Sequence, residues 1–373
     1  MTSIGGAEMV DWNLAVATAT RLVRPGPEVS RDEARAVVAE LRRHAKASEQ
    51  HVRGFTRMGT DDIHDTPILV VDRPGWVRAN VAGFREVLKP LLDKMQERRG
   101  NTPGGAVFGA VGGKVTGVEL GMLLSFLSSR VLGQYETFAP ASRELPAGAK
   151  GGRLLLVAPN IVHVERELDV EPHDFRLWVC LHEETHRTQF TAVPWLRDHL
   201  EGEIQSFLGE TEVDPMTVLE RIREAAQSLA GGRPEGEEDD EGRSLVEIVQ
   251  TPAQREILGR LTAVMSLLEG HADFVMDGVG PDVVPSVAEI REKFQQRRAK
   301  GASRLDSALR KLLGLDAKLR QYRDGERFVH AVVDQVGMDG FNRVWTSPNT
   351  LPTKTEIAKP ADWVARVHRK AES

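Results

Sequence analysis

The sequence predicts a mainly α-helical protein with a few short β-strands. Apolar residues recur at helical spacing along most of the chain. Ser30 followed by Glu33 is the signature of a capping box, which predicts a long helix from there toward Met58. Two short apolar runs, Pro67–Val71 and Arg153–Ile161, have the composition of strands. These observations favour a helical body that carries a small amount of sheet.

The remaining helices follow from the same periodicity. We expect helices at 76–98, 172–192, 195–209, 215–230, 244–276, 286–299, 303–313 and 316–337. Four glycines stand at four-residue spacing and line one face of a further helix: Gly109, Gly113, Gly117 and Gly121. Because glycine has no side chain, this face predicts close packing against another helix in a protein core.

Length and composition describe a globular protein of more than one part. The chain has 373 residues, 40% of them hydrophobic and 28% charged. That length exceeds one ordinary hydrophobic core, so we expect an N-terminal helical region at 1–150 and a second region at 151–373, or one continuous domain. The acidic run at 231–242 predicts a flexible insertion. The net charge of −6 argues against nucleic acid as a partner.

The expected location is the cytoplasm. The single cysteine, Cys180, cannot form an internal disulfide, which fits a reducing compartment. The first residues lack the basic and apolar regions of a signal peptide. The longest stretch without a charged residue, Gly100–Gly113, has 14 residues and is too short to cross a bilayer. We therefore expect a soluble protein with no membrane partner.

Residues 182–186 read HEETH, which is an HExxH motif. On a helix, His182 and His186 lie on one face a turn apart, so both imidazoles can bind one tetrahedral metal ion. Glu183 then lies beside the metal and can act on a bound water. Pro172 suits a first helical turn and Pro194 ends a helix, so the flanking sequence supplies the helix that the motif needs.

A catalytic zinc usually has a third protein ligand. The extended motif with a third histidine is excluded, because Gln189 and Ala192 occupy its positions. Downstream, Glu269 and Asp273 are again four residues apart, so one carboxylate can bind the metal while the other accepts a hydrogen bond from a liganding histidine. His271 is the alternative ligand. It lies about 200° around the helix from Glu269, so only one of the two can face the metal.

Four segments of the chain resemble a known family: LHEETHRTQFTAVPWLRDHL, SLLEGHADFVMD, KLRQYRDGERFV and VWTSPNTLPT. They resemble a zincin-like metallopeptidase family long catalogued as a bacterial domain of unknown function, and the likeness runs from about Asp11 to the C-terminus. Members are labelled zinc-dependent metalloproteases or hydrolases, and some are linked to deazaflavin coenzyme biosynthesis. The resemblance implies a zincin-like architecture with HExxH on the active-site helix, and Zn²⁺ bound by His182, His186 and Glu269. It implies no particular substrate.

The resulting hypothesis is a cytoplasmic zinc metallopeptidase of the glutamate-zincin type that acts on a peptide or protein. Glu183 would be the general base toward the zinc-activated water. Tyr322 and Arg323 are candidate donors to the developing oxyanion, and Arg153–Ile161 is a candidate edge strand for an extended substrate. The alternative is a catalytically silent zinc-bound scaffold or regulatory binding protein, which would not require Glu183.

Overall fold

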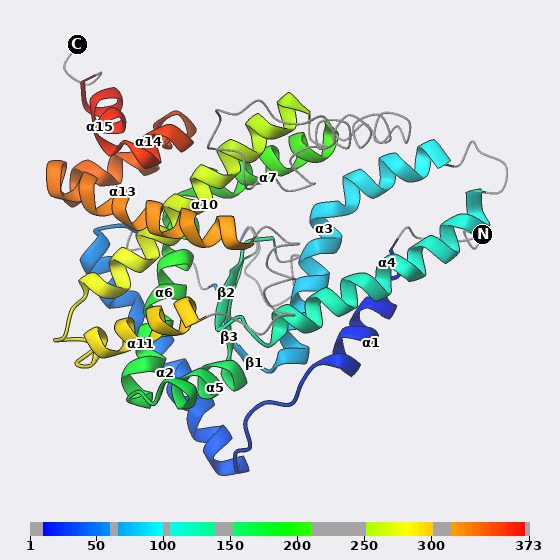
Figure 1. The fold of residues 1–373 in the computed structure, drawn as a ribbon, viewed down its shortest axis with the longest axis horizontal. Coiled ribbons are helices and arrows are strands. Elements are labelled where there is room, and N and C mark those ends of the chain that lie inside the picture. Colours follow the sequence, from blue (N-terminus) through cyan, green and yellow to red (C-terminus); the bar gives the residue numbers. More distant parts are fainter. Residues whose placement is uncertain are drawn as a thin grey trace, which may run out of the picture. The chain divides into compact units, whose positions relative to one another are not determined.

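A computed structural model describes residues 10–59, 66–99, 105–138, 152–210, 251–300 and 315–369 (Figure 1). The described chain is mainly helical and contains one small sheet, so the predicted fold class is confirmed. The acidic run at 231–242 and the helices expected at 215–230 and 303–313 lie outside the described residues.

The helices agree with most of the predicted ranges. Those before the motif are α1 (Trp12–Leu22), α2 (Arg31–Thr56), α3 (Arg73–Arg99), α4 (Gly105–Ser128) and α5 (Ala158–Leu168). The others are α6 (Pro172–Ala192), α7 (Pro194–Gly209), α10 (Pro252–Gly278), α11 (Val287–Lys300), α13 (Leu315–Phe341), α14 (Lys354–Ala358) and α15 (Pro360–Arg369), with 3-10 turns η1 (Asn342–Trp345) and η2 (Pro348–Thr350). The predicted start of α2 is confirmed, because the Ser30 hydroxyl accepts a hydrogen bond from the Glu33 amide at 3.1 Å.

The sheet has three strands: β1 (Ile68–Val71), β2 (Gly133–Glu136) and β3 (Arg153–Val157). Their order is β1-β3-β2, with β3 parallel to β1 and antiparallel to β2. The strand expected at Arg153–Ile161 is therefore present but shorter, since α5 begins at Ala158 with a proline in its first turn. The prediction that it is an edge strand is wrong, because β1 and β2 pair with its two sides. Among the described strands, β2 is the edge strand that follows α4.

The two faces of β2 contact different helices. Gln134 points toward α3, where its side-chain oxygen accepts a hydrogen bond from the Trp76 indole at 2.8 Å. Tyr135 points to the opposite face and stacks on Phe190 of α6, with ring centroids 5.5 Å apart. This alternation is that of a strand between two layers. It places the edge of the sheet against the helix that carries the HExxH motif.

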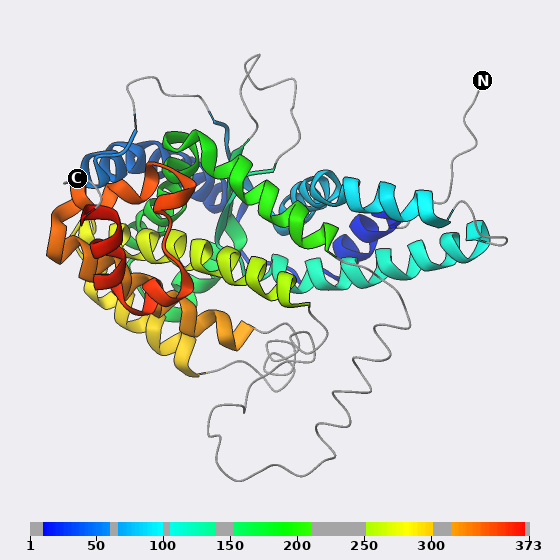
Figure 2. The ribbon, with the colours of Figure 1, turned by 90° about the horizontal axis from the view of Figure 1, so that it is seen from above.

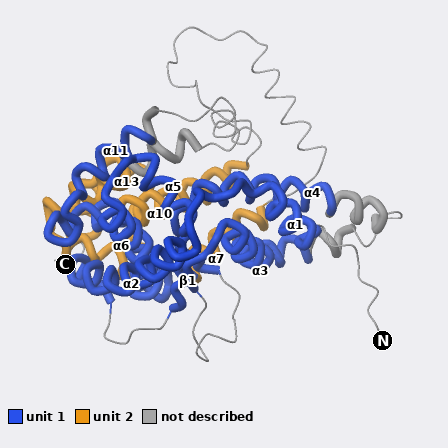
Figure 3. Tube along the Cα trace, turned by 90° about the horizontal axis from the view of Figure 1, so that it is seen from below, with its two compact units in different colours: residues 1–197, 271–300 blue, residues 198–270, 301–373 orange. Residues whose placement is uncertain are grey.

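The chain divides into two compact units (Figure 3). Unit 1 comprises residues 1–197 and 271–300, and unit 2 comprises residues 198–270 and 301–373. The boundary between Gly270 and His271 passes through α10, which continues unbroken from Pro252 to Gly278. The domain division expected at residue 150 stays a prediction, since compact units are not a test of independent folding.

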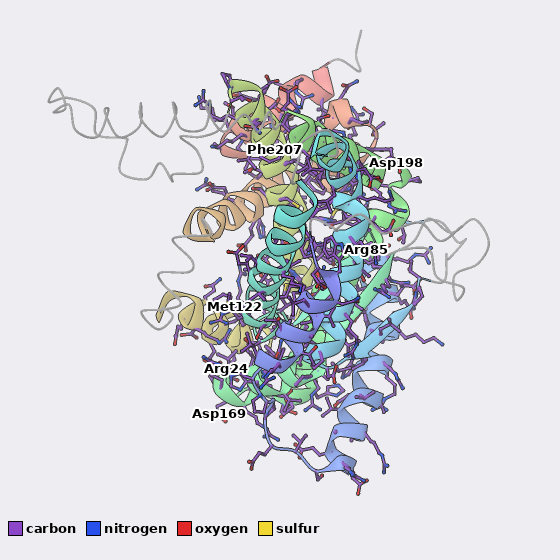
Figure 4. All side chains as sticks on the ribbon, turned by 90° about the vertical axis from the view of Figure 1, so that its right-hand side faces the viewer. Arg24, Arg85, Met122, Asp169, Asp198 and Phe207 are labelled. Atoms are coloured by element: carbon purple, nitrogen blue, oxygen red, sulfur yellow. The ribbon has the colours of Figure 1, made fainter. Side chains whose placement is uncertain are left out.

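In unit 1, α1 packs along the glycine face of α4, and Figures 1 and 2 both show the two helices side by side. A Cβ on Gly117 would lie 2.6 Å from the Asp11 carbonyl oxygen, and one on Gly121 would lie 2.7 Å from that of Ala15. The predicted close packing is confirmed for these two glycines. By contrast Met122, labelled in Figure 4, is 49% exposed.

The motif helix α6 lies in the interior of unit 1. Phe175, Cys180 and Leu181 are fully buried, and α2 packs along the helix. In unit 2, α13 crosses α10 where Gly325 meets Gly270, and a Cβ on either glycine would overlap the other helix. This close crossing holds α10 at the residue that follows Glu269. None of the described helices has the length and apolar character needed to span a membrane.

Candidate metal centre

The two histidines of the motif face each other on α6. The Nε2 atoms of His182 and His186 are 3.3 Å apart, and their rings are nearly perpendicular, at 88°. Two nitrogens bound to one tetrahedral zinc at about 2.0–2.1 Å are separated by about 3.3 Å. The structure thus positions the two imidazoles at the spacing of ligands that share a single ion.

The carboxylate of Glu269 joins this pair. One ligand atom each from His182, His186 and Glu269 lies within 4.8 Å of the other two. Two imidazoles and one carboxylate are a common donor set of catalytic zinc, which keeps its fourth position for water. The structure thus brings together the three residues that the sequence predicted as ligands, and two imidazoles with one carboxylate fit zinc by their chemistry.

His271 lies elsewhere. Its side chain is fully buried, and its Nδ1 is 3.0 Å from the Nε2 of Gln189. Burial, followed by the nearby His186, lowers the pKa of His271 to about 3, so the imidazole is neutral. The structure therefore brings Glu269, and not His271, into the ligand group.

Each histidine of the motif has possible hydrogen-bond acceptors near its Nδ1 atom. The Nδ1 atom of His182 lies 3.5 Å from the Asp273 carboxylate and 3.2 Å from the Met276 sulfur. The Nδ1 atom of His186 lies 3.0 Å from the side-chain oxygen of Gln189. An acceptor at Nδ1 requires the proton there and leaves the Nε2 lone pair for a metal. Asp273 thus lies near a histidine of the motif, and its role there stays a prediction, while the contact made by Gln189 has no signal in the sequence.

Glu183 lies against the edge strand. Its side chain is buried, with 6% exposure, and a Cβ on Gly133 would lie 2.5 Å from its Cγ and 2.8 Å from its Oε1. Only a glycine in β2 leaves room for this carboxylate. Sequence reasoning missed Gly133, because a four-residue strand gives too short a pattern to recognise.

The next residue, Glu184, belongs to a different set of contacts, which connects α6 to α2. Its carboxylate accepts a hydrogen bond from Arg187 at 2.7 Å, and Arg187 also contacts Glu49 of α2 at 2.7 Å. Burial raises the pKa of Glu184 to about 7, although the hydrogen bond and charge of Arg187 act in the opposite direction. This buried network ties α6 to α2.

The predicted oxyanion donors are not tested. The side chains of Tyr322 and Arg323, on α13, lie outside the described residues. The chain has only two tyrosines, and the ring of the other, Tyr135 in β2, stacks on Phe190 of α6. Burial raises the pKa of Tyr135 to about 12, so its phenol is neutral at physiological pH.

The helix, the edge strand and the candidate ligand group have the arrangement expected of a zincin, and comparison with known proteins identifies that family. A family model described as zincin-like metallopeptidase matches residues 10–364, and the chain belongs to this family. Membership implies a metal, typically zinc, and indicates a zinc-dependent hydrolase.

A solved structure supports the same assignment. A protein from Chloroflexus aurantiacus, described as a candidate hydrolase with a novel fold, is 30% identical to the chain. The likeness covers 96% of this chain and 99% of that one, with a TM-score of 0.67. A comparison with curated proteins gives no match.

Proposed function

We propose that the chain is a zinc metallopeptidase that hydrolyses peptide bonds. The observation that carries this proposal is the ligand group of His182, His186 and Glu269 with the Glu183 carboxylate next to it in sequence and buried against β2. A metal-binding scaffold needs the ligands alone. A hydrolase also needs a base beside them, and Glu183 meets that requirement.

The roles of the side chains follow from their positions. His182, His186 and Glu269 would hold the ion, and bound zinc supplies a Lewis acid that makes water more acidic and polarises a carbonyl. Glu183 accepts the proton of the attacking water and then passes it to the leaving amine. Tyr322 and Arg323 remain the proposed donors to the oxyanion.

Two residues position the ligands without touching the reacting atoms. Asp273 and Gln189 each face the Nδ1 atom of a liganding histidine, so they fix the tautomer and the ring orientation. Gln189 is itself held by the neutral, fully buried His271. Because Gln189 cannot ionise, this arm of the site keeps its orientation over a wide pH range.

The edge strand supports a peptide as the substrate. Within the described residues, β2 pairs with β3 on one side only. An extended peptide can add to such an edge through main-chain hydrogen bonds. A chain bound there would run past Gly133, the residue that Glu183 packs against. The cytoplasmic location and the absence of nucleic-acid and membrane partners stay predictions.

The test is cleavage of a diverse peptide library by purified, zinc-loaded protein. We expect the wild type to cleave peptides, and Glu183→Gln to bind the same amount of zinc while losing cleavage. Cleavage at the wild-type rate by Glu183→Gln would remove that residue from its role. Zinc binding by a wild type that cleaves nothing in the library would favour the catalytically silent scaffold.

A further inference from the structure

A second group of ligand-type side chains lies at the other end of α6. Glu40 and His44 are one turn apart on α2, and His173 is in the first turn of α6. One ligand atom from each lies within 4.8 Å of the other two. All three residues belong to unit 1.

The separations within this group match those of metal ligands. The Oε1 atom of Glu40 is 3.4 Å from His44 Nε2 and 3.0 Å from His173 Nδ1. These values bracket the separation of about 3.3 Å between ligands of a tetrahedral zinc. The two rings have centroids 4.6 Å apart at 76°, close to the 4.8 Å and 88° of the histidine pair in the HExxH motif.

His44 points into the group and is buried there. Its side chain is 9% exposed, and within the described residues its Nε2 makes no hydrogen bond of good geometry, only the 3.4 Å contact with Glu40 Oε1. A buried polar nitrogen of this kind calls for an explanation, and an ion is one.

Neighbouring charges orient the carboxylate. Arg176 donates a hydrogen bond to the other oxygen of Glu40, Oε2. It also donates to both carboxylate oxygens of Glu165, at 2.5 Å to Oε1 and 2.9 Å to Oε2. The guanidinium holds the Glu40 carboxylate so that Oε1 faces the two histidines. His173 has a side chain that is 60% exposed, which gives an ion access from solvent.

We propose that Glu40, His44 and His173 form a second metal site, for Zn²⁺ or a similar divalent cation, that links α2 to the first turn of α6. Imidazole nitrogens with one carboxylate suit zinc better than calcium or magnesium, which prefer oxygen. His173 and His182 are nine residues apart on one helix, or about 14 Å. The two sites therefore hold separate ions and do not form a two-metal centre, whose ions lie about 4 Å apart.

The proposal does not depend on the hydrolase function, and metal counting tests it directly. Full-length protein is stripped with a chelator, dialysed against Zn²⁺ and analysed for bound metal. The wild type should bind about two zinc ions per chain, and His182→Ala and His173→Ala about one each. The double variant should bind none. Because His173 is exposed, its loss leaves no cavity, and circular dichroism checks that each variant is folded.

The matched control is His163→Ala. His163 is also exposed, and it lies 4.0 Å from Glu167 one turn along α5, but it is absent from the ligand groups found among the described residues. We expect this variant to keep two zinc ions. Equal loss of zinc in His163→Ala and His173→Ala would reduce the signal to weak surface binding and overturn the proposal.

A second readout isolates the new site from the first. In His182→Ala, added zinc should raise the midpoint of thermal unfolding, because an ion bound by α2 and α6 stabilises the folded state. His182→Ala combined with His173→Ala should show no such rise. A wild type that saturates at one zinc which His182→Ala no longer binds, or a His173→Ala variant that binds as much zinc as the wild type, would contradict the second site. Neither result would bear on catalysis at the first.

Discussion

The two sides of α6 carry adjacent glutamates with different surroundings. Glu183 follows His182 in the HExxH motif and lies against the bare backbone of Gly133. Glu184 lies about 100° further around the helix, where Arg187 donates a hydrogen bond to its carboxylate and also contacts Glu49 of α2. Both side chains are buried, with exposures of 6% and 1%.

The comparison teaches that burial does not separate a catalytic carboxylate from a structural one. What separates them is the set of neighbouring groups. A buried carboxyl group that accepts hydrogen bonds from an arginine stabilises the packing of two helices, and removing the group leaves the arginine without that acceptor. A carboxylate beside metal ligands can exchange a proton with water. The predictions below follow from this difference.

The largest expected effect separates the two glutamates by substitution. Glu183→Gln should lower kcat for peptide hydrolysis by about 10²–10⁴-fold, because the general base is lost, with little change in stability. Glu184→Ala should keep kcat within a few-fold but lower the free energy of unfolding by about 3 kcal/mol, because the buried Arg187 loses the group that accepts its hydrogen bond. Steady-state kinetics and urea unfolding measure the two effects. The same kinetic loss in both variants would show that the sides of α6 do not differ in function.

The third ligand gives the next effect. Glu269→Ala should weaken zinc binding by more than about 100-fold, since it removes an atom from the metal. His271→Ala should weaken it by about 10-fold, because it acts only through Gln189. Competition with a zinc chelator measures both affinities. If the order of the two variants is reversed, His271 is the ligand and the assignment of Glu269 is wrong.

The contact between Glu183 and β2 can be tested from the strand. Gly133→Ala should displace the Glu183 carboxylate and lower kcat by about 100-fold, as expected for a misplacement of about 1 Å, while zinc affinity is unchanged. The control is Gly259→Ala on α10, where an added Cβ meets no atom within 4 Å. That variant should keep full activity and gain up to about 1 kcal/mol of stability. Full activity in Gly133→Ala would show that the contact between β2 and Glu183 does not contribute to catalysis.

The pH dependence of stability tests the other side of the helix. Burial raises the pKa of Glu184 to about 7, from the usual 4.5. Its protonated form is therefore favoured in the folded state, and this contribution is complete below pH 4.5 and lost as the pH rises through 7. Zinc-free wild type should lose up to about 3 kcal/mol of stability relative to Glu184→Gln between pH 4.5 and 7.5. A gain over that range would mean that Arg187 outweighs burial.

Much of the site could be predicted from the sequence, because its signals are local. The HExxH spacing, the prolines that bound α6 and the four-residue spacing of Glu269 and Asp273 each lie within one helix. The helix predicted at 172–192 agrees with α6, and the glycines at 117 and 121 pack against α1 as expected.

The contacts that were missed join residues distant in sequence. The strand β2 has four residues, and its stability comes from pairing with β3, so no local pattern announces it. For the same reason Arg153–Ile161 was wrongly placed at an edge. Glu40 and His173 are 133 residues apart and meet only because α2 packs on α6. Four-residue spacing within a helix indicates candidate ligands such as His182 and His186, whereas a residue with no such spacing on its own helix, such as His173, is found only from the fold.

The most direct test of the central claim is anomalous diffraction at the zinc edge from crystals of the zinc-loaded protein. The account predicts a strong peak about 2.0–2.2 Å from His182 Nε2, His186 Nε2 and a carboxylate oxygen of Glu269. A peak coordinated by His271 in place of Glu269, or no peak at the two motif histidines, would contradict it.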